Sequence, residues 1–402
     1  MNDEVFKSLS DTSSFIVPSS SLEPMPTFVK RLLGALVIVF ALWAINAAMS
    51  KEGLFGVGIP LYQVDLWKMA GINVILAVSL NLINGFTGQF SIGHVGFMAV
   101  GAYSSAYLTV YATQGIEQQL AAVLGAQVAA AIIFTFVILV GALAAALAGL
   151  IVGIPTLRLR GDYLAIATLG FAEIIRILIV NVNKIGAATG FRGAVEPWPG
   201  RTTIPAYTDF MWIGIFAVIT IVVIYNIVNS DTGRALVSIR EDELAATAMG
   251  VNTTRYKVTA FVISAAFAGV AGALYGHWRL PHPADFTFTR SFEIIIMIVL
   301  GGMGSITGSV LGALVITFLP ELLRNIPGGV YDYRLVIYAA LLILIMITRP
   351  QGMLGGREFG FNWLKRPQKR SEGDEAVGGA GGVQIAERDD PVADKKQDKE
   401  NR

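Results

Sequence analysis

Few residues in the apolar part of this sequence could bind or move a polar solute, and most of them cluster in one short segment. Three polar residues stand among five closely spaced glycines: Gln89, Ser91 and His94 among Gly85, Gly88, Gly93, Gly96 and Gly101. Glycine at membrane depth permits either close helix packing or a broken helix whose freed backbone groups meet a solute. Both interpretations stay open for the glycines alone. The polar neighbours favour a pathway-lining segment whose candidates are Gly88, Gln89, Ser91 and His94.

A second set of candidates lies in the apolar run 163–182. Glu173 and Arg176 are three residues apart and are therefore neighbours on one helical face. Ionisable groups inside a membrane are costly unless they are paired or wetted. The two residues form either a structural ion pair that locks two helices or part of a functional interior. Both interpretations turn this face, with Thr168 near it, toward the inside of the protein.

A third cluster, GGMGSITGSVLGAL at 301–314, has the same order of Gly, Ser and Ile as the first. Two glycine-interrupted segments in the two halves of a transporter are typical of structural repeats that meet at a central site. Gly301 and Gly304 therefore join the pathway candidates. The matching stretches, GQFSIG and MGSITG, are short, so chance similarity is the alternative.

Several kinds of chemistry are not expected. The sequence contains no G-x-x-x-x-G-K-[ST] phosphate loop, so the chain is not expected to bind or hydrolyse ATP itself. It has no cysteine, which excludes thiol catalysis and disulfides. A net charge of +1 does not indicate the basic surface that nucleic-acid binding needs. His277 and His282 lack a third ligand at suitable spacing, so no metal site is expected. We therefore expect no enzyme activity and no cofactor in this chain.

The elements that must position these residues are membrane helices. At 54% hydrophobic and 15% charged residues, with a mean hydropathy of +0.62, the chain carries more apolar surface than a soluble core could bury. The predicted fold is an all-α polytopic membrane protein of about ten transmembrane or re-entrant helices, with an internal pseudo-repeat left open. The expected spans are 28–48, 66–83, 96–111, 120–152, 163–182, 210–228, 258–276, 292–300, 306–322 and 334–347. The run 120–152 is long enough to tilt or to contain a break.

The remaining segments are polar. Residues 1–27 form a polar N-terminal segment without the features of a signal peptide, and 28–349 form the membrane domain. Residues 350–402 form a tail that is expected to be largely disordered, from about 373 onward, because it is polar and low in aromatic residues. The Gly- and Pro-rich loop 183–209 is either a structured connector on the outer face or part of a platform for a soluble binding protein.

Basic residues predict the orientation. They cluster at 30–31, 158–160, 234–257 and after the last span at 349. All four groups share the cytoplasmic side if an even number of crossings separates each pair. This condition requires 292–322 to form two crossings or a re-entrant pair that turns at the glycines 301, 302 and 304. The N- and C-termini are then cytoplasmic.

The charged interruption 230–257 is the most informative loop. Glu241, Asp242 and Glu243 open a short helical pattern with a small-residue face that includes Ala245 and Ala246. Gly250 stands where a glycine commonly ends a helix. A plain connector would need far fewer residues, so this loop suits docking into a groove on a partner.

Three stretches of this sequence resemble one family of transport proteins. ELAATAMG at 243–250, followed by VNTTRYKVTAFVISAAFAGVAGAL, is similar to the coupling loop of ATP-binding-cassette (ABC) importer permeases. Together with TGQFSIGHVGFMAVGAY at 87–103 and LRLRGDYLAIATLGFAEIIRI at 157–177, this sequence most resembles the LivM-like permeases for branched-chain amino acids. The resemblance covers roughly 66–350. Leu244 occupies the position of the family's usual glutamate, with Glu243 one residue earlier.

The resemblance implies an inner-membrane permease subunit for leucine, isoleucine or valine that has no ATPase site of its own. Its implied partners are two ATP-binding subunits that bind the ATP, a second homologous permease or a second copy, an extracytoplasmic solute-binding protein and membrane lipid. Glu241, Glu243, Ala245, Ala246 and Gly250 would couple it to the ATPases. A urea or short-amide permease is the alternative cargo class. An ion-coupled secondary transporter, for which Glu173 would be the coupling carboxylate, is the alternative mechanism.

Overall fold

The computed structural model describes residues 60–159, 161–324, 339, 340, 343, 347 and 352–354. In this part of the chain every regular element is a helix, which confirms the all-α prediction. The predicted span 28–48 and the segment 1–27 lie outside the described residues. So do most of the predicted span 334–347 and most of the tail 350–402.

The longer helices are α3 (Leu61–Asn81), α4 (His94–Tyr111), α5 (Gln114–Leu124), α6 (Ala126–Thr156), α7 (Asp162–Val180), α8 (Phe210–Val228), α9 (Asp231–Glu241), α10 (Glu243–Ala248), α11 (Thr253–Gly276), α12 (Phe288–Gly301) and α13 (Ile306–Arg324). The short turns are η1 (Leu82–Phe86), η2 (Asn183–Ile185), η3 (Ala187–Thr189) and η4 (Pro283–Phe286). Among the described residues, five helices are long and apolar enough to cross a membrane: α3 with η1, α6, α7, α8 and α11. The expected count of about ten is therefore supported only roughly.

The predicted run 120–152 is not one helix. It is divided at Gly125 into α5, whose residues are exposed or half-buried, and α6, a helix of 31 residues. The break anticipated as one of two interpretations is therefore present near the beginning of the run. At about 1.5 Å per residue, α6 is longer than the apolar core of a membrane, which is about 30 Å thick.

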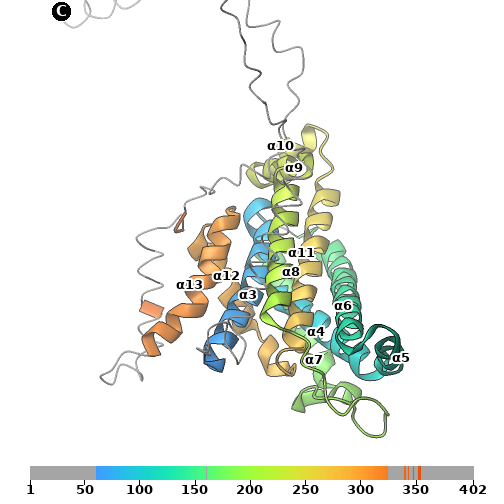
Figure 1. Ribbon diagram of the computed structural model, residues 1–402. Helices are drawn as coiled ribbons and strands as arrows, with labels where there is room; N and C mark the ends of the chain where they lie inside the picture. The colour runs from blue at the N-terminus through green and yellow to red at the C-terminus, as the bar shows by residue number, and fades with distance from the viewer. Residues whose placement is uncertain are drawn as a thin grey trace, which may run out of the picture. The chain divides into compact units, whose positions relative to one another are not determined.

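Helix α11 is the centre of the packing and contacts α3, α4 and α6 (Figure 1). Its buried face consists largely of alanine and glycine, including Ala265, Ala268 and Gly272. A Cβ at Gly101 of α4 would overlap the carbonyl group of Gly269, and a Cβ at Gly272 would overlap the carbonyl oxygen of Met98. Small residues therefore let these helix backbones approach closely, which is how helices associate where both faces are apolar.

The helices run between two ends of the bundle. Helices α9 and α10 lie at one end, beyond α8 and α11 (Figure 1). The opposite end holds α5 and the loop 183–209, where the Arg201 amide donates to the carbonyl of Val110 and the Phe191 amide to that of Pro281. The Met353 amide donates to the carbonyl of Leu300. Met353, which follows the last expected span in the sequence, therefore contacts the C-terminal end of α12.

The central packing makes one prediction about stability. Gly272→Ala should lower the free energy of unfolding by about 1–3 kcal/mol, the usual cost of adding a methyl group to a close-packed core. Its added Cβ meets a backbone carbonyl of α4 that cannot rotate away. The matched control is Gly170→Ala in α7, where an added Cβ has no neighbour within 4 Å. Thermal unfolding in detergent checks this, and equal melting temperatures for the two variants would contradict it.

Candidate functional site

The glycine-rich segment 87–93 interrupts the membrane helices. Helix α3 continues through the π-helical turn η1, the chain is non-helical from 87 to 93, and α4 begins at His94. Backbone groups that lose their helical partners here bond instead to the side chain of Asn84 and to the backbone of η1. The Ser91 amide donates to Asn84 Oδ1 at 3.1 Å, Asn84 Nδ2 donates to the Ser91 carbonyl at 3.3 Å, and the Gln89 amide donates to the Ile83 carbonyl at 3.1 Å. We call residues 87–93 the first break.

Two of the pathway candidates hold the first break in place. His94 is 1% exposed, and its Nε2 lies 2.9 Å from Ser79 Oγ of α3. Thr168 of α7 is also 1% exposed, and its Oγ1 accepts a hydrogen bond from the Ile92 amide at 3.1 Å. Within this chain both residues have structural partners that join α3, the first break and α7.

The glycines of this region divide into two groups. A Cβ at Gly93 would overlap the Thr168 carbonyl, and one at Gly96 would lie 2.8 Å from Cα of Ala172, so these two glycines and Gly101 serve close helix packing. Gly88 differs because it is exposed, with a φ of +70°. Gln89 is 8% exposed, and its Oε1 has no hydrogen-bond partner among the described residues.

A second break separates α12 from α13, and it lies against η1, which precedes the first break: a Cβ at Gly85 would overlap the Gly304 amide nitrogen. Helix α12 ends at Gly301, the chain turns through residues 302–305, and α13 begins at Ile306, as the glycine cluster predicts. Asn81, the last residue of α3, ties the second break to the end of α3. Its Oδ1 accepts from the Gly304 amide at 3.0 Å, and its Nδ2 donates to the Ser305 carbonyl at 3.0 Å.

Glu173 and Arg176 form the expected ion pair, with 2.7 Å between Oε2 and Nε. Their orientation differs from the prediction. The buried face of α7 consists of Leu164, Ala165 and Thr168 with Ile179, whereas the side chains of Glu173 and Arg176 are 30% and 31% exposed. The pair therefore lies beside the packed face and not in the interior of this chain.

The charged loop 230–257 contains two helices where the sequence predicted one. Glu241 ends α9 and does not open the docking helix. Asp242 instead caps α10, because its Oδ1 accepts hydrogen bonds from the amides of Leu244 and Ala245 at 2.8 and 3.0 Å. Gly250 follows α10 with a φ of +85°, a conformation that favours glycine and confirms its role as the helix stop.

Helix α10 has one anchored face and one free face. Ala246 is 5% exposed, and Glu243 pairs with Lys257 of α11 at 2.6 Å. Since Lys257 is only 4% exposed, Glu243 is the counter-charge of a buried cation and holds α10 against α11. The other face is open, with Leu244 68% and Met249 85% exposed and Ala245 exposed beside them. A partner that docks on α10 would meet this apolar face.

Three residues important to this geometry were not predicted from the sequence: Asn81, Arg240 and Lys257. Asn81 stood inside an expected span, where an isolated amide is a signal of a buried hydrogen-bonding role. Lys257 begins the apolar run of α11, and its acidic partner lies 14 positions earlier in the loop, so spacing alone does not identify the pair. Arg240 was considered only as one of the basic residues that fix orientation.

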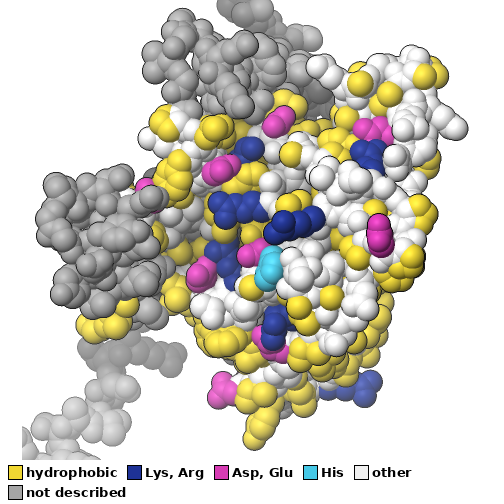
Figure 2. All heavy atoms as spheres, turned by 90° about the horizontal axis from the view of Figure 1, so that it is seen from below, with side chains coloured by type: hydrophobic (Ala, Val, Ile, Leu, Met, Phe, Trp, Pro, Cys, Tyr) yellow, Lys and Arg dark blue, Asp and Glu magenta, His cyan; other side chains and the backbone are white. Residues whose placement is uncertain are grey.

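The opposite end of the bundle forms a cap in which basic and acidic side chains gather near the middle of the face (Figure 2). The carboxylate of Glu117 in α5 pairs with Arg201 and accepts a hydrogen bond from the Tyr207 hydroxyl at 2.7 Å. Burial and the hydrogen bond to Glu117 raise the pKa of Tyr207 to about 12, so this hydroxyl stays a donor at neutral pH. These contacts tie the loop 183–209 to α5.

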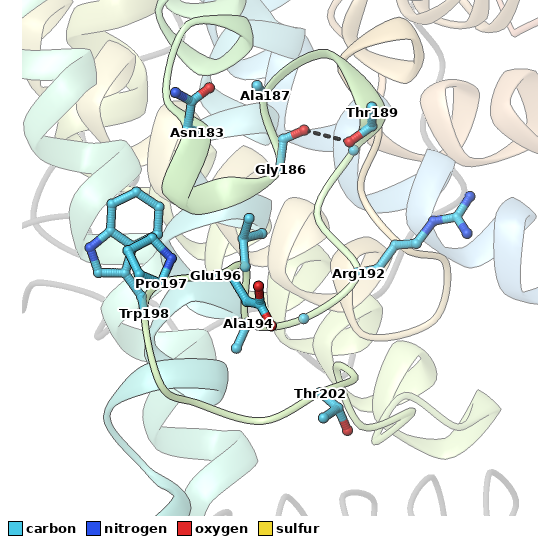
Figure 3. A pocket seen from close by; sticks show the side chains of 13 residues that line it. Asn183, Gly186, Ala187, Thr189, Arg192, Ala194, Glu196, Pro197, Trp198 and Thr202 are labelled. Atoms are coloured by element: carbon cyan, nitrogen blue, oxygen red, sulfur yellow. Dashed lines mark hydrogen bonds between the residues drawn. The ribbon is translucent and has the colours of Figure 1, made fainter.

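The same loop encloses a groove of about 710 Å³, lined by Asn183, Thr189, Trp198 and Thr202 among others (Figure 3). Thr189 Oγ1 donates to the Gly186 carbonyl at 2.7 Å. The side chains of Arg192 and Trp198 point to opposite sides of this loop (Figure 3). None of the pathway candidates lines this groove. The loop is therefore structured, as both interpretations of it require.

Comparison with known proteins agrees with this architecture. Residues 63–346 match the family model described as "Branched-chain amino acid transport system / permease component". The chain is 32% identical to the "High-affinity branched-chain amino acid transport system permease protein LivM" of Salmonella typhimurium, over 90% of this chain and 81% of that protein. It is also 32% identical to the LivM protein of Escherichia coli K12, over 82% of this chain and 81% of that protein.

A more distant similarity is to the permease protein LivH of Salmonella typhimurium, with 32% identity over 43% of this chain and 53% of that protein. Among solved structures, an inward-facing metal-chelate type ABC transporter aligns with a TM-score of 0.40 and 13% identity, over 79% of this chain and 99% of that one. The extent of the family match, which covers both breaks, α9 and α10, decides the assignment. The chain belongs to the family of branched-chain amino acid transport system permease components.

Proposed function

We propose that this protein is the inner-membrane permease subunit of an ABC importer for leucine, isoleucine and valine. The observation that carries the proposal is α10, a capped helix at one end of the bundle with an exposed apolar face and an anchored opposite face. Such a helix suits a groove on a separate subunit that binds and hydrolyses ATP. The family assignment and the names of the similar LivM proteins support the cargo.

The full transporter is proposed to contain two ATP-binding subunits, a second permease that is a homologue or another copy of this chain, and an extracytoplasmic solute-binding protein. The α9–α10 end faces the cytoplasm, where the basic residues of 234–257 lie. The cap formed by α5 and the loop 183–209 then faces outward and receives the binding protein. Its fixed Glu117, Arg201 and Tyr207 network supports a firm landing surface.

In the proposed mechanism, this chain receives the energy of ATP hydrolysis only as a movement of α10. Closure of the ATPase dimer presses on α10, tilts α8 and α11, and turns a central cavity from the cytoplasm toward the loaded binding protein. Gly88, Gln89 and Ser91 of the first break, with Gly301 and Gly304 of the second, are the proposed pathway elements. The partnerless Oε1 of Gln89 supports this assignment, since a buried amide oxygen lacking a protein donor can accept from the ammonium group of an amino acid.

An ion-coupled carrier explains the structure less well. It would need a carboxylate free to bind an ion within the membrane, and Glu173 was the one candidate. Glu173 is already paired with Arg176 at 2.7 Å. An ion-coupled carrier also has no use for a capped helix with an exposed apolar face.

The docking role of α10 can be tested at Met249, which is 85% exposed and has no role in holding the helix. Met249→Asp should prevent the ATP-binding subunits from co-purifying with the permease and abolish ATP-driven leucine uptake, because it places a charge on the apolar docking face. Met249→Leu, the matched control, keeps that face apolar and should preserve both. Pull-down from membranes and uptake into vesicles check this, and normal co-purification of the Asp variant would show that α10 is only a connector.

The anchor of α10 makes a separate prediction. Glu243→Ala should lower the free energy of unfolding by about 1–3 kcal/mol and reduce uptake, because it leaves the charge of buried Lys257 without a partner. Removing both charges in Glu243→Ala/Lys257→Met should restore much of the stability, since an apolar pair avoids the cost of burying an unpaired charge. Thermal unfolding of the two variants decides it: a double variant less stable than the single one contradicts the proposed anchor.

A further inference from the structure

Arg240 lies where three parts of the molecule meet. It is next to the end of α9, yet its side chain extends away from the loop toward the two breaks. Its Nη1 donates to the Gly85 carbonyl in η1 at 3.1 Å, while its Nε and Nη2 reach Glu241 Oε1 at 3.1 and 2.6 Å. The guanidinium is thus held at two sides, a geometry that suits its rigid planar fork of donors better than the single point charge of a lysine ammonium.

The first break is shaped to receive this side chain. Gly88 is positioned so that a Cβ would lie 2.6 Å from Cγ of Arg240, a distance that excludes any larger residue without movement of the arginine. The Gly85 carbonyl belongs to a π-helical turn, where the regular hydrogen-bond ladder of the helix is altered and a carbonyl can take an external donor. The stem of Arg240 and its guanidinium therefore contact two consecutive parts of the interruption between α3 and α4.

The second break is in reach of the same group. A Cβ at Gly304 would lie 3.1 Å from Nη1 of Arg240, so the glycine gives the guanidinium room. Gly304 is in turn held by Asn81, whose amide bridges it and Ser305 to the end of α3. One arginine thus lies between α9, the first break and the second break.

We propose that Arg240 is the positioning residue that makes α9 and the two breaks move as one unit, so that motion imposed on α10 reaches the proposed pathway. This inference rests on the proposed function, in which α10 receives force from the ATPase. It assigns Arg240 no contact with the cargo. Without Arg240, α9 is expected to move without carrying the breaks along.

The uptake experiment uses the complete transporter in proteoliposomes. Arg240→Gln should retain ATP hydrolysis but lower leucine uptake per ATP about tenfold or more, the effect of losing a hydrogen bond from a charged donor. Arg240→Lys should keep part of the coupling, because it preserves the charge and the stem over Gly88. The control is Arg234→Gln on the same helix, which breaks only the exposed pair of Arg234 and Asp231. Equal uptake per ATP for Arg240→Gln and Arg234→Gln would overturn the proposal.

A distance measurement separates this inference from the proposed function. The natural chain has no cysteine, so Arg234→Cys on α9 and Met303→Cys in the second break, at side chains that are both exposed, can carry spin labels. The transporter with Arg240 should give one narrow distance distribution with and without ATP. Adding Arg240→Gln should broaden or shift it when ATP binds. An unchanged narrow distribution in that variant would overturn the role of Arg240, whereas absence of ATP-driven leucine uptake by the unaltered transporter would overturn the proposed function instead.

Discussion

Backbone polar groups that leave a helix inside an apolar bundle must find partners within the protein, and this constraint shapes the two breaks. Regular helices satisfy their own backbone groups, whereas interrupted ones depend on side chains from other elements. Asn84 supplies these bonds to the first break and Asn81 to the second, while Thr168 accepts from Ile92. The breaks are thus ordered by amide and hydroxyl side chains that α3, η1 and α7 hold in place.

Satisfying the breaks also joins distant parts of the sequence. Asn81 ties the first half of the described chain to the turn after α12, more than 200 positions away. Arg240 ties the same region to the charged loop through the Gly85 carbonyl. The Glu243–Lys257 pair then holds α10 against α11, the helix at the centre of the bundle. The α9–α10 end, with the exposed apolar face of α10, is therefore connected by short polar contacts to the interruptions in the membrane helices.

The sequence predicted the features that depend on local pattern. Apolar runs located α4, α7, α8 and α11 closely, and glycines located both breaks and the end of α10 at Gly250. It did not predict α9, because a charged loop contains no apolar run to mark a helix. It predicted that Glu173 faces the interior, because helical spacing shows which residues share a face but not which face packs. The partners of Asn81, Arg240 and Lys257 could not be predicted from the sequence, since contacts between remote segments leave no periodic signal.

The most direct test of the account is transport by the assembled complex. Proteoliposomes that contain this permease, its ATP-binding subunits, its second permease and the binding protein would be loaded with ATP and offered radiolabelled leucine and urea in parallel. The account predicts ATP-dependent accumulation of leucine, inhibited by isoleucine and valine, and no accumulation of urea. Accumulation of urea without leucine would contradict the cargo, and leucine uptake that proceeds without ATP would contradict the coupling through α10.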